Sequence, residues 1–192
     1  MDEKIGTGVA VGGTATMNGI ESESVAVKTI YHFECLDSTG NLRWEEFAEN
    51  TVVNVGLDDL LDKYFKGSTY TAAHYVGLTD GTPTPAPGDT MSSHGGWVEV
   101  TDYLNSPDVR PTLTLGTVSS QSVDNSASKA SFAMAGASPD SITIGGAFIT
   151  TDSTKGGTSG TLYSIAAFSG GDKTLNNGDT LNVTATLTAA SA

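Results

Sequence analysis

The stretch DTLNVTATLT, residues 179–188, decides the fold class because apolar and polar side chains alternate along it without interruption. The apolar positions are Leu181, Val183, Ala185 and Leu187, and threonine or asparagine fills the positions between them. In an extended chain successive side chains point to opposite faces, so a period of two places every apolar residue on one face. The stretch therefore predicts a β-strand with one buried and one polar face.

Similar short runs recur upstream, separated by turns rich in Gly, Asp and Ser. Many short strands at close spacing are typical of antiparallel sandwiches and jelly-roll-like barrels. We therefore predict a mainly β protein, an antiparallel β-sandwich or jelly-roll-like domain, with its single β-rich domain over residues 28–192 and most of its strands within 97–190. The expected strands lie near 73–78, 97–103, 110–118, 129–135, 141–150 and 160–168.

The first part of this domain, residues 28–67, predicts a hairpin followed by one helix. Tyr31, Phe33 and Cys35 share one face of a strand, and the turn-forming residues 37–41 separate it from a second extended run. The helix is expected over about residues 56–66. Its apolar residues fall at i, i+3, i+4, i+7 and i+8, the spacing of one helical stripe. They are Leu57, Leu60, Leu61, Tyr64 and Phe65.

Residues 79–96 predict a long surface loop, because three prolines and four glycines in this stretch prevent regular structure. Loops of this length are uncommon unless they are functional or disordered, so this loop is a candidate contact surface. The residues proposed for contact are Pro83, Pro85, Pro87, His94 and Trp97.

Residues 1–27 hold neither helical nor strand periodicity for long and predict an extended N-terminal arm. One interpretation is a frayed terminus, since chain ends are often poorly ordered. The other is an arm that a neighbouring subunit orders. Ile5, Val9 and Val11 would then be its anchors, because a purely disordered tail does not need them.

Charge excludes several classes of function. The 192 residues contain 9 Lys and Arg against 22 Asp and Glu, which gives a formal net charge of −13. Without a basic cluster the chain cannot neutralise phosphates, so we expect no nucleic-acid partner, and an acidic membrane surface would repel it. No run of 18 apolar residues occurs, and the first 25 residues lack the pattern of a signal peptide. Cys35 is the single cysteine, so an intrachain disulfide is excluded.

The motifs of known chemistry are absent or incomplete. The nucleophile-elbow pattern G-x-S-x-G does not occur, and the histidines His32, His74 and His94 lack the spacing of a zinc site. Asp152, Asp172 or Asp179 could contribute to a calcium site, but the calcium-loop string is missing. We therefore predict no catalytic residues, no cofactor and no metal. A small hydrolase or lyase using His94 is the weakest alternative, because no nucleophile, base and orienting group can be placed together.

Longer stretches of the chain resemble a family of small virion structural proteins of tailed bacteriophages. The resemblance covers roughly residues 28–190 and is most specific in three places. These are the Gly/Pro loop that leads into GDTM and H-x-GW (88–97), the RP-x-LT run (110–114) and the GGAFITT strand (145–151). Members of this family look like head-associated or decoration components, and related sequences are also described as tail or fibre proteins. The family brings no catalytic residues.

The resemblance implies a non-enzymatic protein of the virion, made in the host cytoplasm. The leading hypothesis is a capsid decoration or cement protein on the outer surface of the head, whose partners are the major capsid protein and further copies of itself, with a trimer expected. Its arm and the 79–96 loop would supply the contacts, and its acidic charge would keep many copies soluble. The alternative is a tail or fibre component that binds the host surface.

Overall fold

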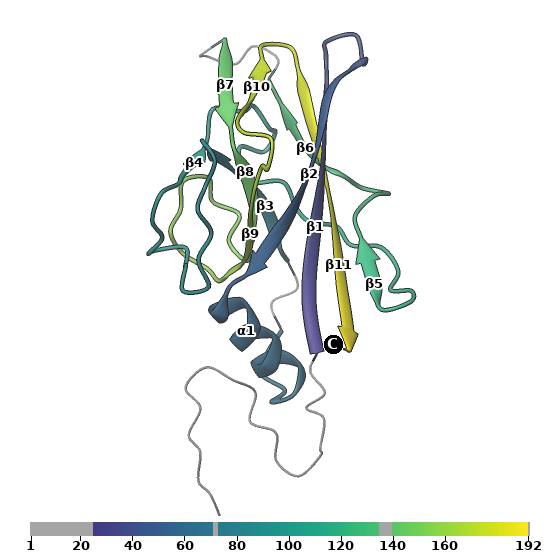
Figure 1. The fold of residues 1–192 in the computed structure, drawn as a ribbon, viewed down its shortest axis with the longest axis vertical. Coiled ribbons are helices and arrows are strands. Elements are labelled where there is room, and N and C mark those ends of the chain that lie inside the picture. Colours follow the sequence, from purple (N-terminus) through teal and green to yellow (C-terminus); the bar gives the residue numbers. More distant parts are fainter. Residues whose placement is uncertain (1–24, 71–72, 135–139, 192) are drawn as a thin grey trace, which may run out of the picture.

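The computed structural model describes residues 25–70, 73–134 and 140–191 (Figure 1). This part of the chain contains eleven strands and one helix. In chain order the elements are β1 (Val25–Leu36), β2 (Leu42–Val52), α1 (Asn54–Tyr64), β3 (Tyr75–Asp80), β4 (Val98–Val100), β5 (Ser122–Asp124), β6 (Ala130–Ala133), β7 (Ser141–Ile144), β8 (Gly146–Thr150), β9 (Leu162–Ala167), β10 (Lys173–Asn176) and β11 (Thr180–Ser191).

Nine of the strands form one antiparallel sheet with the order β4-β3-β8-β9-β2-β1-β11-β5, in which β6 also pairs with β11. The long strand β2 pairs with β1 along residues 42–49 and with β9 only at residues 50–52. The sheet therefore bends at β2, so that its two halves face each other across a common core, while β7 and β10 pair separately. This arrangement confirms the predicted mainly β, antiparallel sandwich with one short helix.

The longest pairing joins the two strands with the clearest alternation. β1 and β11 are antiparallel over twelve residue pairs, from Val25↔Ser191 to Leu36↔Thr180. In this register Phe33 lies opposite Val183, and both are fully buried. Each such side chain contributes about 1.5–3 kcal/mol by leaving water. Residues 25–27, which the sequence placed in the arm, instead pair with residues 189–191, so the body begins three residues earlier than predicted.

Aromatic side chains join the two halves of the sheet. Phe33 of β1 meets Phe168, the residue after β9, edge to face with ring centroids 4.7 Å apart. The Tyr31 hydroxyl and the Ser164 hydroxyl of β9 are hydrogen-bonded at 2.8 Å, so the one polar atom that Tyr31 brings into the core is satisfied. The hairpin aromatics Tyr31 and Phe33 thus belong to the core.

Two predicted strands differ in the structure. Residues 110–118 make only an isolated bridge, between Thr112 and Tyr75, and otherwise run as irregular chain along the body. The expected strand over 141–150 is divided at Gly145 into β7 and β8, which lie in different sheets. A Cβ at Gly145 would lie 1.7 Å from the carbonyl oxygen of Gly81, so only glycine allows the chain to pass this point. The periodicity of the sequence cannot reveal a close approach such as that between Gly145 and Gly81.

A buried ion pair fixes the loop that connects β8 to β9. The Arg110 guanidinium is fully buried and donates from Nε and Nη2 to the two carboxylate oxygens of Glu99, each at 2.7 Å. It also donates to the carbonyl oxygens of Asp152 and Gly157, both at 2.8 Å. Because carboxylate and carbonyl oxygens together accept from every nitrogen of the guanidinium, the charge is compensated inside the protein.

Candidate functional site

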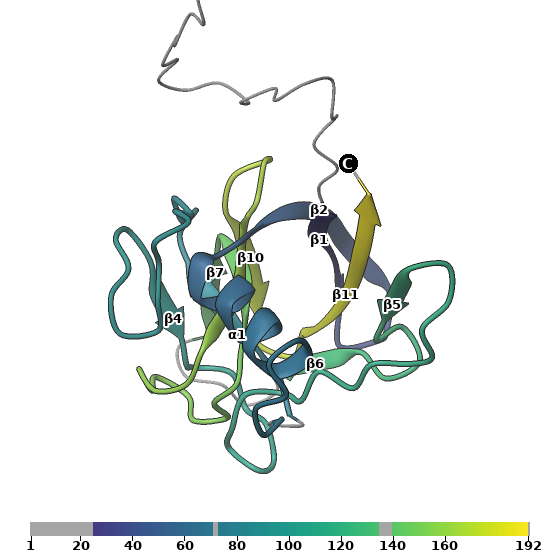
Figure 2. The same cartoon turned by 90° about the horizontal axis from the view of Figure 1, so that it is seen from below.

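The helix α1 lies across one end of the sandwich, where Figure 2 looks along the sheet from below. It follows β2 directly, and the buried residue Val53 precedes its first turn. The Val53 N–H donates to the Tyr163 carbonyl of β9 at 3.2 Å, and the Asn54 N–H donates to the Pro87 carbonyl at 2.8 Å. These two bonds attach the start of the helix to both the sheet and the Gly/Pro loop.

A glycine brings α1 against the sheet. Gly56 is the buried residue of the helix, and a Cβ there would lie 2.5 Å from the carbonyl oxygen of Tyr163. The helix therefore touches β9 through backbone at this point. The observed bounds, Asn54–Tyr64, begin and end two residues before the predicted helix, and Gly67 follows in the left-handed conformation with φ of +76°.

The apolar stripe of α1 is exposed. Leu61 is 55 % exposed and Tyr64 78 %, and Phe65, just after the helix, is 77 % exposed. Leu57 and Leu60 are also among the exposed large apolar side chains. An amphipathic helix normally turns such a stripe to the core, but Gly56 determines which side of this helix faces the sheet. We call this surface the helix face and define it by Leu57, Leu60, Leu61, Tyr64 and Phe65.

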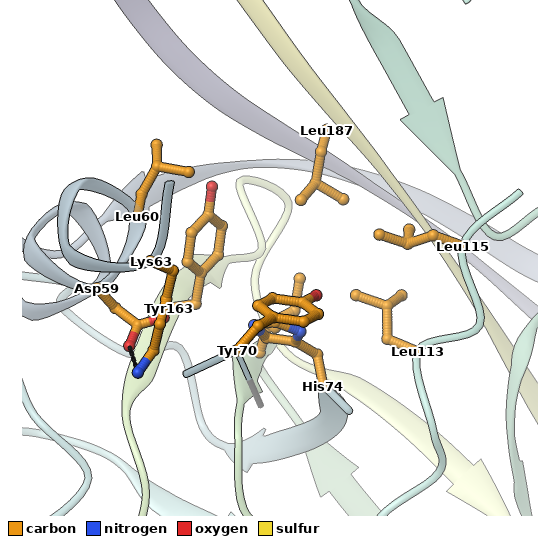
Figure 3. Close-up of a pocket in the computed structure, with 10 residues that line it drawn as sticks. Asp59, Leu60, Lys63, Tyr70, His74, Leu113, Leu115, Tyr163 and Leu187 are labelled. Carbon is orange, nitrogen blue, oxygen red and sulfur yellow. Dashed lines mark ion pairs between the residues drawn. The ribbon is translucent and has the colours of Figure 1, made fainter. Parts of the chain in front are cut away.

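A pocket of about 190 Å³ opens beside the helix face (Figure 3). Leu60 belongs to both, so the two surfaces are continuous. Leu187 enters the pocket from β11 and Ile149 from β8, while Leu113 and Leu115 come from the irregular chain after Arg110. We call this cavity the pole pocket. Its full lining is Asp59, Leu60, Lys63, Tyr70, His74, Leu113, Leu115, Ile149, Tyr163 and Leu187.

The polar groups of the pole pocket are neutral or paired. Burial lowers the pKa of His74, and the nearby Asp59 carboxylate only partly opposes this, so the imidazole is uncharged at pH 7. Burial also raises the pKa of the Tyr163 hydroxyl, which therefore stays protonated. Lys63 Nζ lies 4.0 Å from Asp59 and 3.8 Å from Asp62. An apolar guest would thus meet aliphatic and aromatic walls and one compensated ion pair.

This arrangement suits binding better than catalysis. The pole pocket contains no serine or cysteine, and its one imidazole makes an edge-to-face contact with the Tyr163 ring at 6.2 Å. The single thiol of the protein, Cys35, lies in the core, where burial and the neighbouring Asp179 raise its pKa to about 12. A pocket of 190 Å³ with five aliphatic walls accommodates one apolar side chain of a peptide.

A few buried residues anchor the Gly/Pro loop and the residue that follows it to the body. Pro83 and Trp97 are buried, and Trp97 belongs to a second apolar cluster that includes Met91 and Phe148 of β8. Neither Pro83 nor Trp97 therefore presents a side chain to a partner in this structure. The loop was predicted as a contact surface, but these two residues serve its own folding.

The other predicted contact residues of the loop are more accessible. Pro87 is exposed and Pro85 half-buried. His94 stacks on Trp97 with ring centroids 3.5 Å apart, and both line a cavity of about 200 Å³ beside Gly156 and Gly157. The contact roles of Pro85, Pro87 and His94 remain predictions. Ile5, Val9 and Val11 lie outside the described residues.

The three aspartates considered for calcium are engaged separately. Asp179 is buried and pairs with Arg43, Asp152 accepts the Thr154 N–H at 2.6 Å, and Asp172 accepts the Thr82 hydroxyl at 2.6 Å. Across residues 25–70, 73–134 and 140–191, no three acidic, histidine or cysteine side chains are grouped as metal ligands. The fold therefore holds these three aspartates in separate hydrogen bonds and ion pairs.

Sequence reasoning did not find the pole pocket. Its walls come from α1, β8, β9, β11 and two irregular segments, so no local motif records it. The one signal in the sequence was the apolar stripe of α1, whose residues are as expected but whose orientation is set by Gly56.

No protein-family model, curated protein or solved structure matches this chain. In the described part of the chain, no helix has the length and apolar character needed to cross a membrane.

Proposed function

We propose that this chain is a structural protein of a tailed-bacteriophage virion, and that it binds the assembled head as a decoration protein. The sequence resemblance over residues 28–190 suggests the virion. The observation that carries a binding role is the helix face, a group of large exposed apolar side chains next to an apolar pocket at one end of the sandwich. Contiguous exposed apolar surface of this kind marks sites of protein contact.

The charge and the architecture agree with this proposal. A net charge of −13 disfavours self-association before assembly and contact with nucleic acid. A two-layer sandwich with a preceding segment of 24 residues offers a rigid body and an extension that can reach a neighbour. In the proposed function, the helix face, residues 1–24 and the exposed part of the Gly/Pro loop contact the shell, and copies of the chain meet around a local symmetry axis.

Copy number in purified virions tests the proposal. Quantitative mass spectrometry against the major capsid protein should give a ratio near one, or a simple fraction set by the axes of the lattice. A count of about 3 to 12 copies, the range of cyclic assemblies at a tail or vertex, would replace the decoration role with a tail or fibre role. Complete absence of the chain from virions would refute both.

A deletion separates the arm from the body. A chain without residues 1–24 should keep the β-sheet circular dichroism spectrum of the full chain, because all described pairings begin at Val25 or later. It should bind purified shells more weakly than the full chain. Equal occupancy on the shells would remove residues 1–24 from the proposed contact.

A further inference from the structure

The end of the molecule that carries α1 exposes a group of large apolar side chains. Besides the helix face, Tyr70 is 63 % exposed and Leu115 38 %, and both line the pole pocket. Patches of this kind promote association unless something covers them. The described residues supply no cover for this surface.

A segment that covers this surface has to reach this end of the molecule. Residues 1–24 join the body here, because they lead directly into Val25 at the start of β1. Leu187, which lines the pole pocket, is paired with Thr29 of β1, and Thr29 is four residues after Val25. At about 3.3 Å per residue in a strand, Val25 is roughly 13 Å further along β1. The start of β1 and the helix α1 lie at the same end of the body in Figure 1.

Residues 1–24 are long enough for this role. Extended, 24 residues span up to about 80 Å, whereas an α-helix of the length of α1 spans about 16 Å. The segment is therefore long enough to reach every part of the helix face and the pole pocket, even if many of its residues are needed to reverse the direction of the chain.

The composition of the segment also fits the surface. Ile5, Val9 and Val11 are aliphatic, and glycine, alanine and threonine fill most of the positions around them. Small residues let a backbone approach a flat apolar surface closely, and one aliphatic side chain matches a pocket of 190 Å³ with aliphatic walls. Ile5, Val9 and Val11 carry no charge, so they would not compete with the ion pair between Lys63 and Asp59 in the pocket lining.

We propose that in the free protein residues 1–24 fold back onto the helix face of the same molecule, with an aliphatic side chain from Ile5, Val9 or Val11 in the pole pocket. The segment is tethered at the end where it binds, so its effective concentration is on the order of millimolar, which exceeds that of a second copy in dilute solution. The helix face is thereby covered in the free protein. This inference goes beyond the proposed function and does not depend on it.

The test is hydrogen exchange of the backbone amides of α1 in the full-length chain, measured by mass spectrometry. The test variant replaces Ile5, Val9 and Val11 together by serine, which removes the aliphatic groups and keeps length and charge. The matched control replaces Thr7, Thr14 and Thr16 by serine in the same segment. Neither variant changes a residue of the described body, so both should fold.

We expect the amides of α1 to exchange about tenfold faster in the test variant than in the full chain and the control, because the helix loses the segment that covers it. The naphthalene sulfonate dye ANS should bind the test variant several-fold more strongly. Replacing Leu61 by Gln in the full chain should reproduce the faster exchange. Leu42→Gln should not. Leu42 is similarly exposed, at 54 %, but it is the first residue of β2, next to the turn that joins β1 to β2.

Two results would overturn the proposal. If the test variant and the control exchange alike, the aliphatic residues of the segment do not cover α1. If protection of α1 falls on dilution from about 100 to 1 µM, the segment comes from a second copy, because an intramolecular contact does not depend on concentration. Both results are obtained on the isolated protein, so they are distinct from a failure to find the chain in virions.

Discussion

Arg110 and the helix face show opposite combinations of polarity and burial. Arg110 is charged and fully buried, yet Glu99 and two backbone carbonyls accept hydrogen bonds from all three of its nitrogens. The helix face is apolar and exposed, and within the described residues nothing compensates for that exposure. The hydrogen bonds of Arg110 are all made within the protein. The helix face, in contrast, can be buried only by another segment or another molecule.

This difference separates a structural role from a binding role. A buried charge is tolerated only when its partners are held in place, so the Arg110 network must be intact for the fold. Exposed apolar side chains contribute little to the stability of the isolated body, so their presence needs a different explanation. The predictions below test this contrast in order of expected effect.

The largest effect is expected at Arg110. Arg110→Ala removes the guanidinium and leaves the Glu99 carboxylate buried beside the Gly156 N–H alone, which should cost about 3–5 kcal/mol of unfolding free energy. Urea unfolding followed by circular dichroism measures the loss. The control is Lys28→Ala, which breaks the exposed pair with Glu49 and should cost about 0.5 kcal/mol or less. Equal losses of unfolding free energy in the two variants would show that the buried Arg110 network contributes no more to stability than an exposed ion pair.

The next effect concerns the close approach of α1 to the sheet. Gly56→Ala places a Cβ 2.5 Å from a backbone oxygen, so the helix must move, at a cost of about 1–3 kcal/mol. Gly88→Ala is the control, since a Cβ there meets nothing within 4 Å, and its effect should lie within about 0.5 kcal/mol. Thermal unfolding compares the two. An unchanged midpoint for Gly56→Ala would show that α1 is not held against β9.

Truncation on the helix face should have a smaller effect on stability than truncation in the core. Leu162→Ala empties a fully buried position and should cost about 2–5 kcal/mol, whereas Leu61→Ala, at an exposed position, should cost less than about 1 kcal/mol. Both follow from urea unfolding curves. A large loss at Leu61 would place the helix face in the core of the native protein.

The smallest effect is a dependence on pH at His74. Burial lowers its pKa in the folded protein, so below about pH 6.5, the usual histidine value, the unfolded chain binds more protons than the folded chain. Stability contributed by neutral His74 is therefore present above this pH and is lost as the pH falls. The unfolding midpoint of His74→Gln should drop less than that of the unmodified chain between pH 7.5 and 5.5. A decline of His74→Gln parallel to that of the unmodified chain would argue against a role of the His74 imidazole in this pH dependence.

The strands with strict alternation were predictable. The period-two patterns of β1 and β11 gave their buried faces correctly, because Tyr31, Phe33, Leu181 and Val183 all point into the core. The short strands β5 and β10 were not predicted, since three or four residues carry little pattern and only one residue of each, Val123 and Leu175, is apolar. The run at 110–118 alternates well but pairs with β3 only around the bridge between Thr112 and Tyr75, where the Leu113 N–H donates to the His74 carbonyl and the rest of the run is irregular.

The candidate site was less predictable than the fold. The sequence indicated a contact role for Trp97, but its large apolar ring is buried against Phe148, since an aromatic residue serves a core as readily as an interface. In contrast, the apolar stripe of α1 was visible in the sequence, and its exposure was not. Helical periodicity predicts which residues share a face, but it does not predict whether that face packs against the core or lies in solvent.

By itself, the sequence of this protein determined the fold class, the acidic net charge, the strand face that Cys35 shares with Tyr31 and Phe33, and the set of residues on the apolar stripe of α1. These depend on composition and on periods of two and 3.6 residues, which are local properties of the chain. Only the tertiary structure decided that Arg110 is buried, that α1 turns its stripe outward and that ten residues from distant segments enclose the pole pocket. These depend on close approaches between segments far apart in sequence, such as Gly56 to Tyr163, which no local pattern encodes.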